Sequence, residues 1–189
     1  MVSPLNGIFK ILYVGRFIYW KGMHLGLKAF SGYLKKYPNS ILTMIGEGPD
    51  INNLKKYSFK LGIDKNVIWK EWINHDDLKK QYQNYDIFFY PSFHDSGGMV
   101  ILESLSSGLP VVCLDLGGPG QIVNSTCGQA IKVNNKKINQ VVSDLSEGLI
   151  NLSNQILLNS DLNSYALKRA HKFTWNKLIK KIYEEEKFF

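Results

Sequence analysis

Short apolar runs alternate with amphipathic stretches along most of the chain. The runs have the length of strands, and several end in Gly or Pro, which is typical of buried β-strands. We predict strands over residues 9–15, 40–46, 66–72, 87–92, 110–115 and 129–133. Runs that are apolar throughout, such as "PVVCL", indicate strands that are covered on both faces.

Between the runs, apolar positions recur at helical spacing. In the stretch 22–37 they fall at positions 23, 27, 30 and 34, and Pro38 stops the pattern. Asp50 stands where a helix N-cap is expected, and Gly62 where a helix should end. We predict helices over residues 22–37, 50–62, 76–85, 99–108, 136–158 and 161–187, and a turn over residues 117–123.

The order of these elements predicts an α/β fold. Strands separated by single helices form βαβ crossovers and a Rossmann-like, doubly wound parallel sheet. We predict a single domain over residues 1–189, with the Rossmann-like core at 8–135 and extra C-terminal helices at 136–189. Ligands of such folds bind at the carboxyl ends of the strands, so residues that directly follow strands are the candidates for function.

Composition narrows the class of protein. The chain has 189 residues, and 44% of them are hydrophobic, enough for a folded core. Cys113 lies in an apolar run and is predicted to be a buried, reduced thiol, which fits the cytoplasm. The first residues lack the pattern of a signal peptide, and no apolar run is long enough to span a bilayer.

The formal net charge is +7, and much of it comes from Lys-Lys doublets spread along predicted helices. We interpret most doublets as solvated helix faces. A positive field also attracts anionic ligands or an acidic membrane surface, so peripheral association with the inner face of the membrane stays open. Nucleic-acid binding is not expected, because the basic residues do not cluster with stacking aromatic residues.

Two cations follow the first predicted strand. Arg16 stands at the carboxyl end of the strand, and Lys21 stands at the entry to the next helix. A planar guanidinium and a mobile ammonium at one crevice suit a diphosphate. Taken singly, Arg16 is better interpreted as a surface residue after a strand and Lys21 as a helix-start residue; it is their combination with the glycine turns that favours the diphosphate. The turn after the second strand contains Gly46 and Gly48, which permit close backbone approach.

The stretch "HDSGGMVILESL" places a helix start between two acids. The N–H groups of Gly97, Gly98 and Met99 are expected at the amino end of that helix, where orphan donors and partial positive charge suit a diphosphate. Glu103 can reach the hydroxyls of an attached ribose, and Asp95 would face a sugar at the other end. The simpler alternatives are that Glu103 complements the helix dipole and that Asp95 is a capping residue.

These motifs together resemble the donor-binding half of the family-4 retaining glycosyltransferases, which have the GT-B fold. Their pattern of an acid, seven residues and a glutamate appears as Asp95 to Glu103, followed by "SLSSGLPVV". Other ordered matches are "YVGRFIYWKG", "LTMIGEGPD", "LGIDKNVIWKEW", "YDIFFYPS", "DLGGPGQIV" and "ALKRAHKFTWNKLIKKIY". The resemblance covers roughly residues 9–183, and several motifs in the correct order are more specific than one glycine-rich loop.

The resemblance implies roles for individual residues. Arg16 and Lys21 would hold the donor diphosphate and stabilise the departing nucleoside diphosphate, so no metal ion or other cofactor is expected. Asp95 would contact the transferred sugar, and Glu103 the ribose. The remaining implied donor-binding residues, near the base or at the helix start, are Gly46, Gly48, Trp72, Ile73, Gly97, Gly98, Met99 and Val100.

Three positions depart from the family pattern. Asp95 stands where a glutamate is usual, which leaves the donor sugar open. Gln121 replaces a common acid, and Glu71 occupies a place often taken by glycine before the base-binding turn. His94 is a peripheral candidate beside Asp95. His75 is expected to be structural or exposed.

The length of the chain matches only the second of the two Rossmann-like domains of a GT-B enzyme, so the acceptor-binding N-terminal domain is expected to be absent. The implied function is binding of a nucleoside-diphosphate sugar for transfer to a hydroxyl acceptor in polysaccharide or glycolipid synthesis. The acceptor would be a glycan or a lipid-linked intermediate. We expect little or no turnover from the isolated chain. The alternative is a non-catalytic nucleotide-binding module or one subunit of a two-chain glycosyltransferase.

Overall fold

The computed structural model describes residues 7–158 and 161–185. Six parallel strands form one sheet in the order β3-β2-β1-β4-β5-β6. The strands are β1 (Lys10–Val14), β2 (Ile41–Ile45), β3 (Val67–Lys70), β4 (Ile87–Tyr90), β5 (Val111–Leu114) and β6 (Gly128–Ile131). Each lies within a predicted strand apart from one residue at the start of β6, so the predicted α/β class and the parallel sheet are confirmed.

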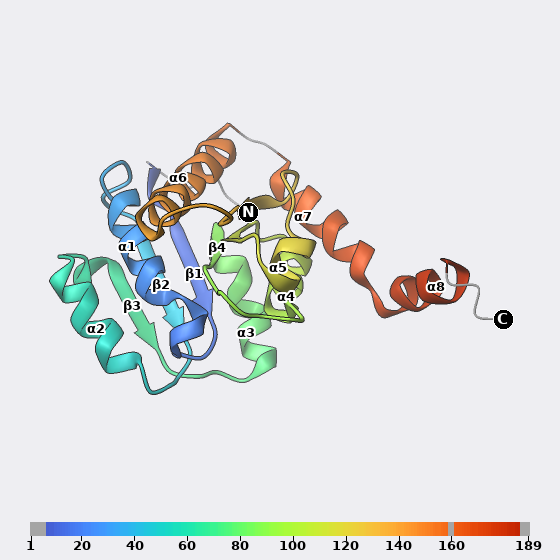
Figure 1. Cartoon of the computed structure of the whole chain (residues 1–189), viewed down its shortest axis with the longest axis horizontal. Helices are drawn as coiled ribbons and strands as arrows, with labels where there is room; N and C mark the ends of the chain where they lie inside the picture. The colour runs from blue at the N-terminus through green and yellow to red at the C-terminus, as the bar shows by residue number, and fades with distance from the viewer. Residues whose placement is uncertain (1–6, 159–160, 186–189) are drawn as a thin grey trace.

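Helices cover both faces of this sheet, as a parallel sheet requires. They are α1 (Met23–Tyr33), α2 (Ile51–Lys60), α3 (His75–Gln81), α4 (Met99–Ser106), α5 (Gly117–Ile122), α6 (Ile138–Leu157), α7 (Leu162–Ala170) and α8 (Trp175–Glu185). Short 3-10 helices are η2 (Tyr19–Lys21), η3 (Asp64–Asn66), η4 (Tyr82–Asn84) and η5 (His171–Phe173). α1 packs against α2 and α6 on one face, and α4 packs against α5 and α7 on the other (Figure 1).

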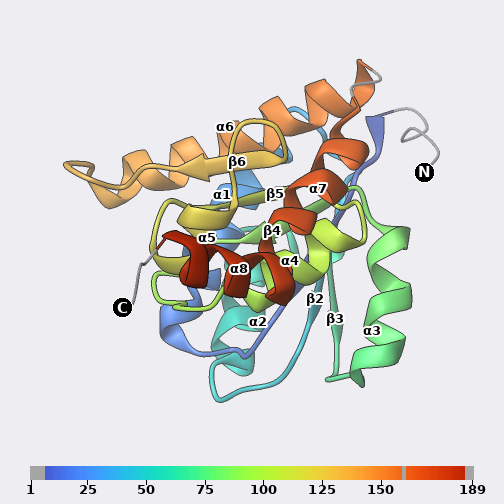
Figure 2. The ribbon, with the colours of Figure 1, turned by 90° about the vertical axis from the view of Figure 1, so that its right-hand side faces the viewer.

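The core lies between these layers and the central strands. Every residue of β4 and of β5 is buried, and Cys113 in β5 is a buried free thiol, as predicted. α6 runs along β6 and β5 (Figure 2) and contributes Leu145, Leu149 and Leu152, which are fully buried. These contacts tie the C-terminal part of the chain to the sheet.

Two predicted elements differ in the structure. The predicted turn at 117–123 is instead the short helix α5, with Pro119 in its first turn, where the missing N–H leaves no intrahelical bond unmade. The predicted helix 161–187 is divided, because Thr174 adopts an extended conformation (φ −67°, ψ 145°) between η5 and α8. Its last residues lie outside the described part of the chain.

The predicted helix boundaries at Asp50 and Gly62 are placed correctly, but Asp50 does not cap. Asp50 occupies the N-cap position of α2, and its side chain makes no capping hydrogen bond. Gly62 follows α2 with a left-handed φ of 69°, the conformation that ends many helices.

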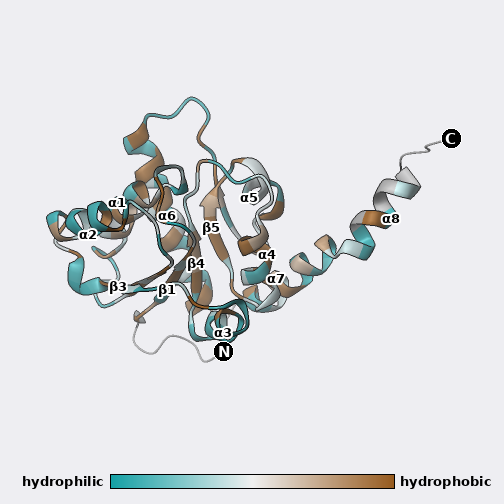
Figure 3. Ribbon diagram, turned by 90° about the horizontal axis from the view of Figure 1, so that it is seen from below, coloured by the Kyte–Doolittle hydropathy of each residue, from teal (hydrophilic) through white to brown (hydrophobic). Residues whose placement is uncertain are grey.

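The last helix leaves the body of the domain. α8 contacts η5 and projects away from the sheet (Figures 1 and 3). Trp175, Ile179 and Tyr183 are exposed along it at a spacing of four residues, so they lie on one face of the helix.

The strand order reverses between β1 and β4. The chain runs outward from β1 to β3 on one side of the sheet and from β4 to β6 on the other. The residues that follow β1 and β4 therefore lie beside this reversal at the carboxyl edge of the sheet, which is the usual position of a ligand in this class of fold.

Candidate functional site

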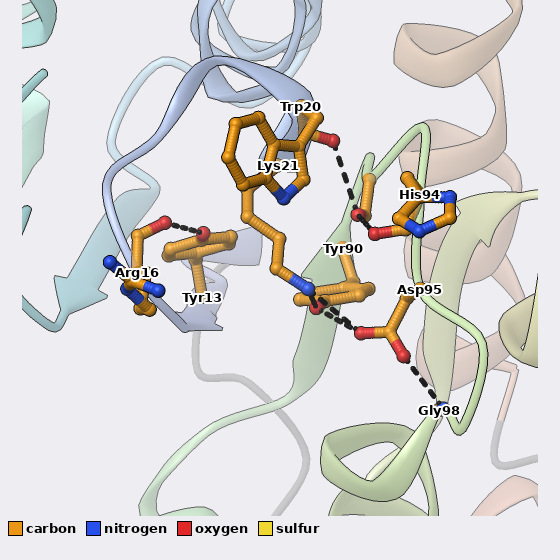
Figure 4. Close-up of polar contacts among 9 residues, drawn as sticks. Tyr13, Arg16, Trp20, Lys21, Tyr90, His94, Asp95 and Gly98 are labelled. Atoms are coloured by element: carbon orange, nitrogen blue, oxygen red, sulfur yellow. Dashed lines mark hydrogen bonds and ion pairs between the residues drawn. The ribbon is translucent and has the colours of Figure 1, made fainter.

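The centre of the site is an ion pair between the two loops that leave β1 and β4. Lys21 Nζ lies 2.9 Å from Asp95 Oδ2, although the residues are 74 positions apart in the sequence. Both side chains are largely shielded, with 17% of each exposed. Tyr90, the last residue of β4, joins the pair: its hydroxyl lies 2.6 Å from Lys21 Nζ and 2.6 Å from Asp95 Oδ2 (Figure 4).

These contacts determine the charge state of the group. Burial alone raises the pKa of Asp95, but hydrogen bonds from Tyr90, Lys21 and Gly98 outweigh it, so the pKa lies below its ordinary value. Burial and the neighbouring Asp95 raise the pKa of the Tyr90 hydroxyl far above its ordinary value. At neutral pH, Asp95 is therefore a carboxylate and Tyr90 a neutral hydrogen-bond donor.

Asp95 also holds the start of α4. Its Oδ1 accepts a hydrogen bond of 2.8 Å from the N–H of Gly98, and its carbonyl accepts one of 2.9 Å from Gly118. The expectation of a free Gly98 N–H is therefore wrong, because Asp95 occupies that donor. The simpler alternative, that Asp95 caps α4, is wrong, because the N-cap is Gly98 and Asp95 accepts a hydrogen bond from the N–H of that residue. Met99 and Val100 begin the helix, where N–H groups have no intrahelical acceptor.

Arg16 lies apart from this group. Its side chain is exposed, and within the described residues its guanidinium makes no hydrogen bond or ion pair. Its carbonyl accepts a hydrogen bond of 3.0 Å from the hydroxyl of Tyr13, and Figure 4 shows Arg16 beside Tyr13 rather than beside Lys21. The structure thus brings Lys21 and Asp95 together and leaves the Arg16 guanidinium at the rim.

Glu103, in the second turn of α4, is the centre of a second polar group. Its Oε2 accepts a hydrogen bond of 3.1 Å from the hydroxyl of Tyr82, and its Oε1 lies 3.6 Å from His75 Nε2. Glu103 is 31% exposed, so its carboxylate is accessible to a ligand. Sequence reasoning missed both partners, because only the fold shows that α3 and η4 lie beside α4.

The family of the chain follows from comparison with known proteins. The family described as "Glycosyl transferases group 1" matches residues 5–169, most of the chain. This chain belongs to the group 1 glycosyl transferases. Its fold is that of the C-terminal half of a GT-B glycosyltransferase.

Individual relatives agree with this family. The chain is 34% identical over 113 residues to an uncharacterized glycosyltransferase of Methanocaldococcus jannaschii, covering 60% of this chain and 29% of that protein. It is 28% identical over 163 residues to the lipopolysaccharide core biosynthesis glycosyltransferase LpsE of Rhizobium meliloti, covering 85% of this chain and 43% of that protein. The chain therefore spans less than half the length of these relatives.

Among solved structures, the fold is similar to that of the pneumococcal O-GlcNAc transferase GtfA, determined in complex with UDP and GlcNAc. The TM-score is 0.79 at 18% identity, covering 95% of this chain and 34% of that one. At this identity the similarity concerns the fold alone.

In this glycosyl transferase domain, the glycines of the loop that follows β2, Gly46 and Gly48, have a structural role. A Cβ on Gly46 would overlap the carbonyl oxygen of Gly15, and one on Gly48 would overlap that of Phe17. The N–H of Phe17 also donates to the Glu47 carbonyl at 2.7 Å. The close backbone approach predicted for these glycines is thus an approach to the loop that carries Arg16, and their contact with a donor stays a prediction.

The remaining predicted positions line the same edge of the sheet. Trp72 is exposed after β3, and Ile73 is partly buried against the core just before α3. His94 is exposed beside Asp95. Gly97 and Met99 line a mainly apolar pocket of about 620 Å³, which Gln121 and Trp175 also line.

Among residues 7–158 and 161–185, no three His, Cys, Asp or Glu side chains are grouped so that they could hold a metal ion. Within the same ranges, no helix combines the length and apolar character needed to cross a bilayer.

Proposed function

We propose that this chain is the donor-binding domain of a retaining glycosyltransferase of family 4. The whole enzyme would move a sugar from a nucleoside-diphosphate sugar to a hydroxyl acceptor in polysaccharide or glycolipid synthesis. The observation that carries the proposal is the hydrogen-bonded group of Lys21, Tyr90 and Asp95 at the carboxyl ends of β1 and β4. This group lies beside the start of α4, where the N–H groups of Met99 and Val100 have no intrahelical acceptor. The UDP in the structurally similar GtfA complex supports a nucleotide ligand.

Lys21 is suited to the leaving group. Its ammonium has three N–H donors, and the contacts with Tyr90 and Asp95 use two of them. The third is left for a diphosphate oxygen. When the bond between the anomeric carbon and the diphosphate breaks, the electron pair stays on the diphosphate, and Lys21 and the rim residue Arg16 compensate the added charge. This supply of positive charge is why we propose transfer without a metal ion.

The two acids would hold the ends of the donor. Asp95 is fixed beside Lys21 and would accept hydrogen bonds from hydroxyls of the transferred sugar. Glu103 would accept hydrogen bonds from the ribose, and its partners Tyr82 and His75 hold it in place. We assign the base to the edge formed by Gly48, Trp72 and Ile73, and the phosphates to the start of α4 at Gly97, Met99 and Val100.

We assign the acceptor-binding site to a part of the whole enzyme outside this chain. The relatives are more than twice as long as the segment that this chain matches in them, since the chain covers 29% and 43% of them. We propose that a glycan or lipid-linked acceptor binds a domain beyond these 189 residues. We also propose that the protein is located in the cytoplasm or at the inner face of the membrane. Without that domain we expect little or no transfer.

Calorimetry with UDP and GDP tests the proposal. The wild type should bind one of them, and Lys21→Met together with Glu103→Ala should weaken binding by at least tenfold, since one charge-assisted contact contributes about 1.5–3 kcal/mol. Lys60→Met is the matched control, because Lys60 is an exposed lysine at the far end of α2. Absence of binding by the wild type, or equal binding by all variants, would contradict the proposal.

The chain covers less than half the length of its relatives, and this also favours a second candidate function. The chain would then be a nucleotide-binding module without its own transfer activity, or one subunit of a two-chain glycosyltransferase. Reconstitution with a candidate first domain distinguishes the two. Transfer of radiolabelled sugar after mixing supports the enzyme, and binding without transfer supports the module.

A further inference from the structure

The Tyr90 hydroxyl contacts both members of the central ion pair. It accepts a hydrogen bond of 2.6 Å from Lys21 Nζ and donates one of 2.6 Å to Asp95 Oδ2. A tyrosine hydroxyl can accept and donate at the same time, whereas an ammonium only donates and a carboxylate only accepts. The hydroxyl therefore connects the cation to the anion without adding charge to the site.

The ring of Tyr90 is held rigidly. Tyr90 is only 2% exposed, and its ring stacks on Tyr13 at 6.0 Å and on Phe88 at 5.9 Å. Tyr13 comes from the neighbouring strand β1 and Phe88 from β4 itself, so residues of both strands at the reversal of strand order pack against the ring. Figure 4 shows the rings of Tyr13 and Tyr90. A side chain with a locked ring places its terminal oxygen more exactly than a loop residue can.

The hydroxyl also keeps its proton. Burial first, and then the hydrogen bond to Asp95 and the negative charge of that residue, raise the pKa of Tyr90 far above its ordinary value. Tyr90 therefore stays a donor to Asp95 across the neutral range, and the direction of both hydrogen bonds is constant.

We propose that Tyr90 is a positioning residue for donor binding. Its hydroxyl fixes Lys21 with one N–H left for the diphosphate and holds the Asp95 carboxylate beside it for the transferred sugar. Because Tyr90 is buried beneath these two side chains, it acts through them and does not touch the donor. This inference rests on the proposed function and adds a residue that the sequence motifs did not single out.

The test is calorimetry of UDP, GDP and UDP-glucose with Tyr90→Phe, which keeps the ring and removes the hydroxyl. We expect binding of the better nucleotide to weaken about tenfold. The matched control is Tyr33→Phe, which removes another buried hydroxyl, bonded to Ser153 Oγ at 2.9 Å. Tyr33 lies at the end of α1 that is far from Lys21. The control should bind within twofold of the wild type.

A double mutant separates positioning from general damage to the fold. UDP carries no sugar for Asp95 to hold, so its binding reports on Lys21 alone. If Tyr90 acts through Lys21, the double variant Lys21→Met with Tyr90→Phe should bind UDP no more weakly than Lys21→Met does. Losses of UDP affinity that add up in the double variant, or an unchanged affinity of Tyr90→Phe, would overturn the inference. In either case, binding of a nucleotide by the wild type would still support the proposed function. Failure of the wild type to bind any nucleotide would overturn both.

A wild-type measurement covers the case in which Tyr90→Phe does not fold. The shielded Tyr90 hydroxyl proton should give an NMR signal with a nuclear Overhauser contact to the Lys21 side chain. That signal should shift when saturating UDP is added, because the diphosphate forms a hydrogen bond with Lys21, which contacts the Tyr90 hydroxyl. A protein that binds UDP while the signal stays unchanged would count against the positioning role.

Discussion

Gly22 packs against the backbone carbonyl of Pro91, and this contact holds Lys21 near Asp95. Gly22 has a left-handed φ of 70°, and a Cβ at this position would overlap the Pro91 oxygen. A hydrogen bond of 2.9 Å from the Phe93 N–H to the Trp20 carbonyl joins the same two loops. Backbone contacts therefore set the distance between the loops from β1 and β4, and the ion pair forms within that frame.

Replacing Gly22 by alanine should separate the loops and destabilise the protein. Gly62 provides the control, because it has a similar φ of 69° and its Cβ would have nothing within 4 Å. Gly62→Ala should lose about 1–2 kcal/mol of unfolding free energy, the cost of the left-handed conformation for alanine. Gly22→Ala should lose clearly more, because it adds a clash with backbone. Urea denaturation measures both, and equal losses would show that the contact with Pro91 does not matter.

The depressed pKa of Asp95 predicts how its contribution to stability changes with acidity. A carboxylate stabilised in the folded state contributes fully above its unfolded pKa of about 3.9, and that contribution is lost as pH falls through the lower folded pKa. The difference in melting temperature between the wild type and Asp95→Asn should therefore be constant at pH 5–7 and narrow below about pH 4. Calorimetric melting across this range measures it, and a gap that widens in acid would contradict the assignment.

If Glu103 binds the ribose, removing a ribose hydroxyl should matter only when Glu103 is present. The wild type should bind 2′-deoxy-UDP about tenfold more weakly than UDP, for the loss of a hydrogen bond to a charged group. Glu103→Ala should bind the two ligands nearly equally. Glu147→Ala, an exposed acid on α6, is the control and should discriminate as the wild type does. Discrimination that survives Glu103→Ala would place the ribose elsewhere.

The attachment of α6 to the sheet can be tested by shortening one side chain. Leu149 is fully buried, so Leu149→Ala should lower the unfolding free energy by about 2–5 kcal/mol. Leu158, which follows the same helix and is 81% exposed, supplies the control, with an expected change within about 0.5 kcal/mol. Equal effects would mean that α6 does not share the core described above.

The local pattern of hydrophobic and polar residues was sufficient to predict most of the strands and helices. Runs such as "PVVCL" have no polar position, and β5 is correspondingly buried at every residue. The pattern failed where local preference and tertiary contact disagree. The glycine-rich pattern of residues 117–123 predicts a turn, yet Gly117–Ile122 form α5, where Gly117 and Gly118 pack closely against the Asp95–Gly98 loop.

The sequence by itself determined the fold class, the family and the presence of Lys21, Asp95 and Glu103 after the correct strands, because strand burial, helix periodicity and motif order are properties of neighbouring residues. The tertiary structure alone decided which of these residues meet. It paired Lys21 directly with Asp95 and placed the Tyr90 hydroxyl in contact with both. It also left the Arg16 guanidinium at the rim and brought Tyr82 and His75 to Glu103. Such contacts depend on strand order and on loop-to-loop packing between residues far apart in the chain, and no local pattern carries that information.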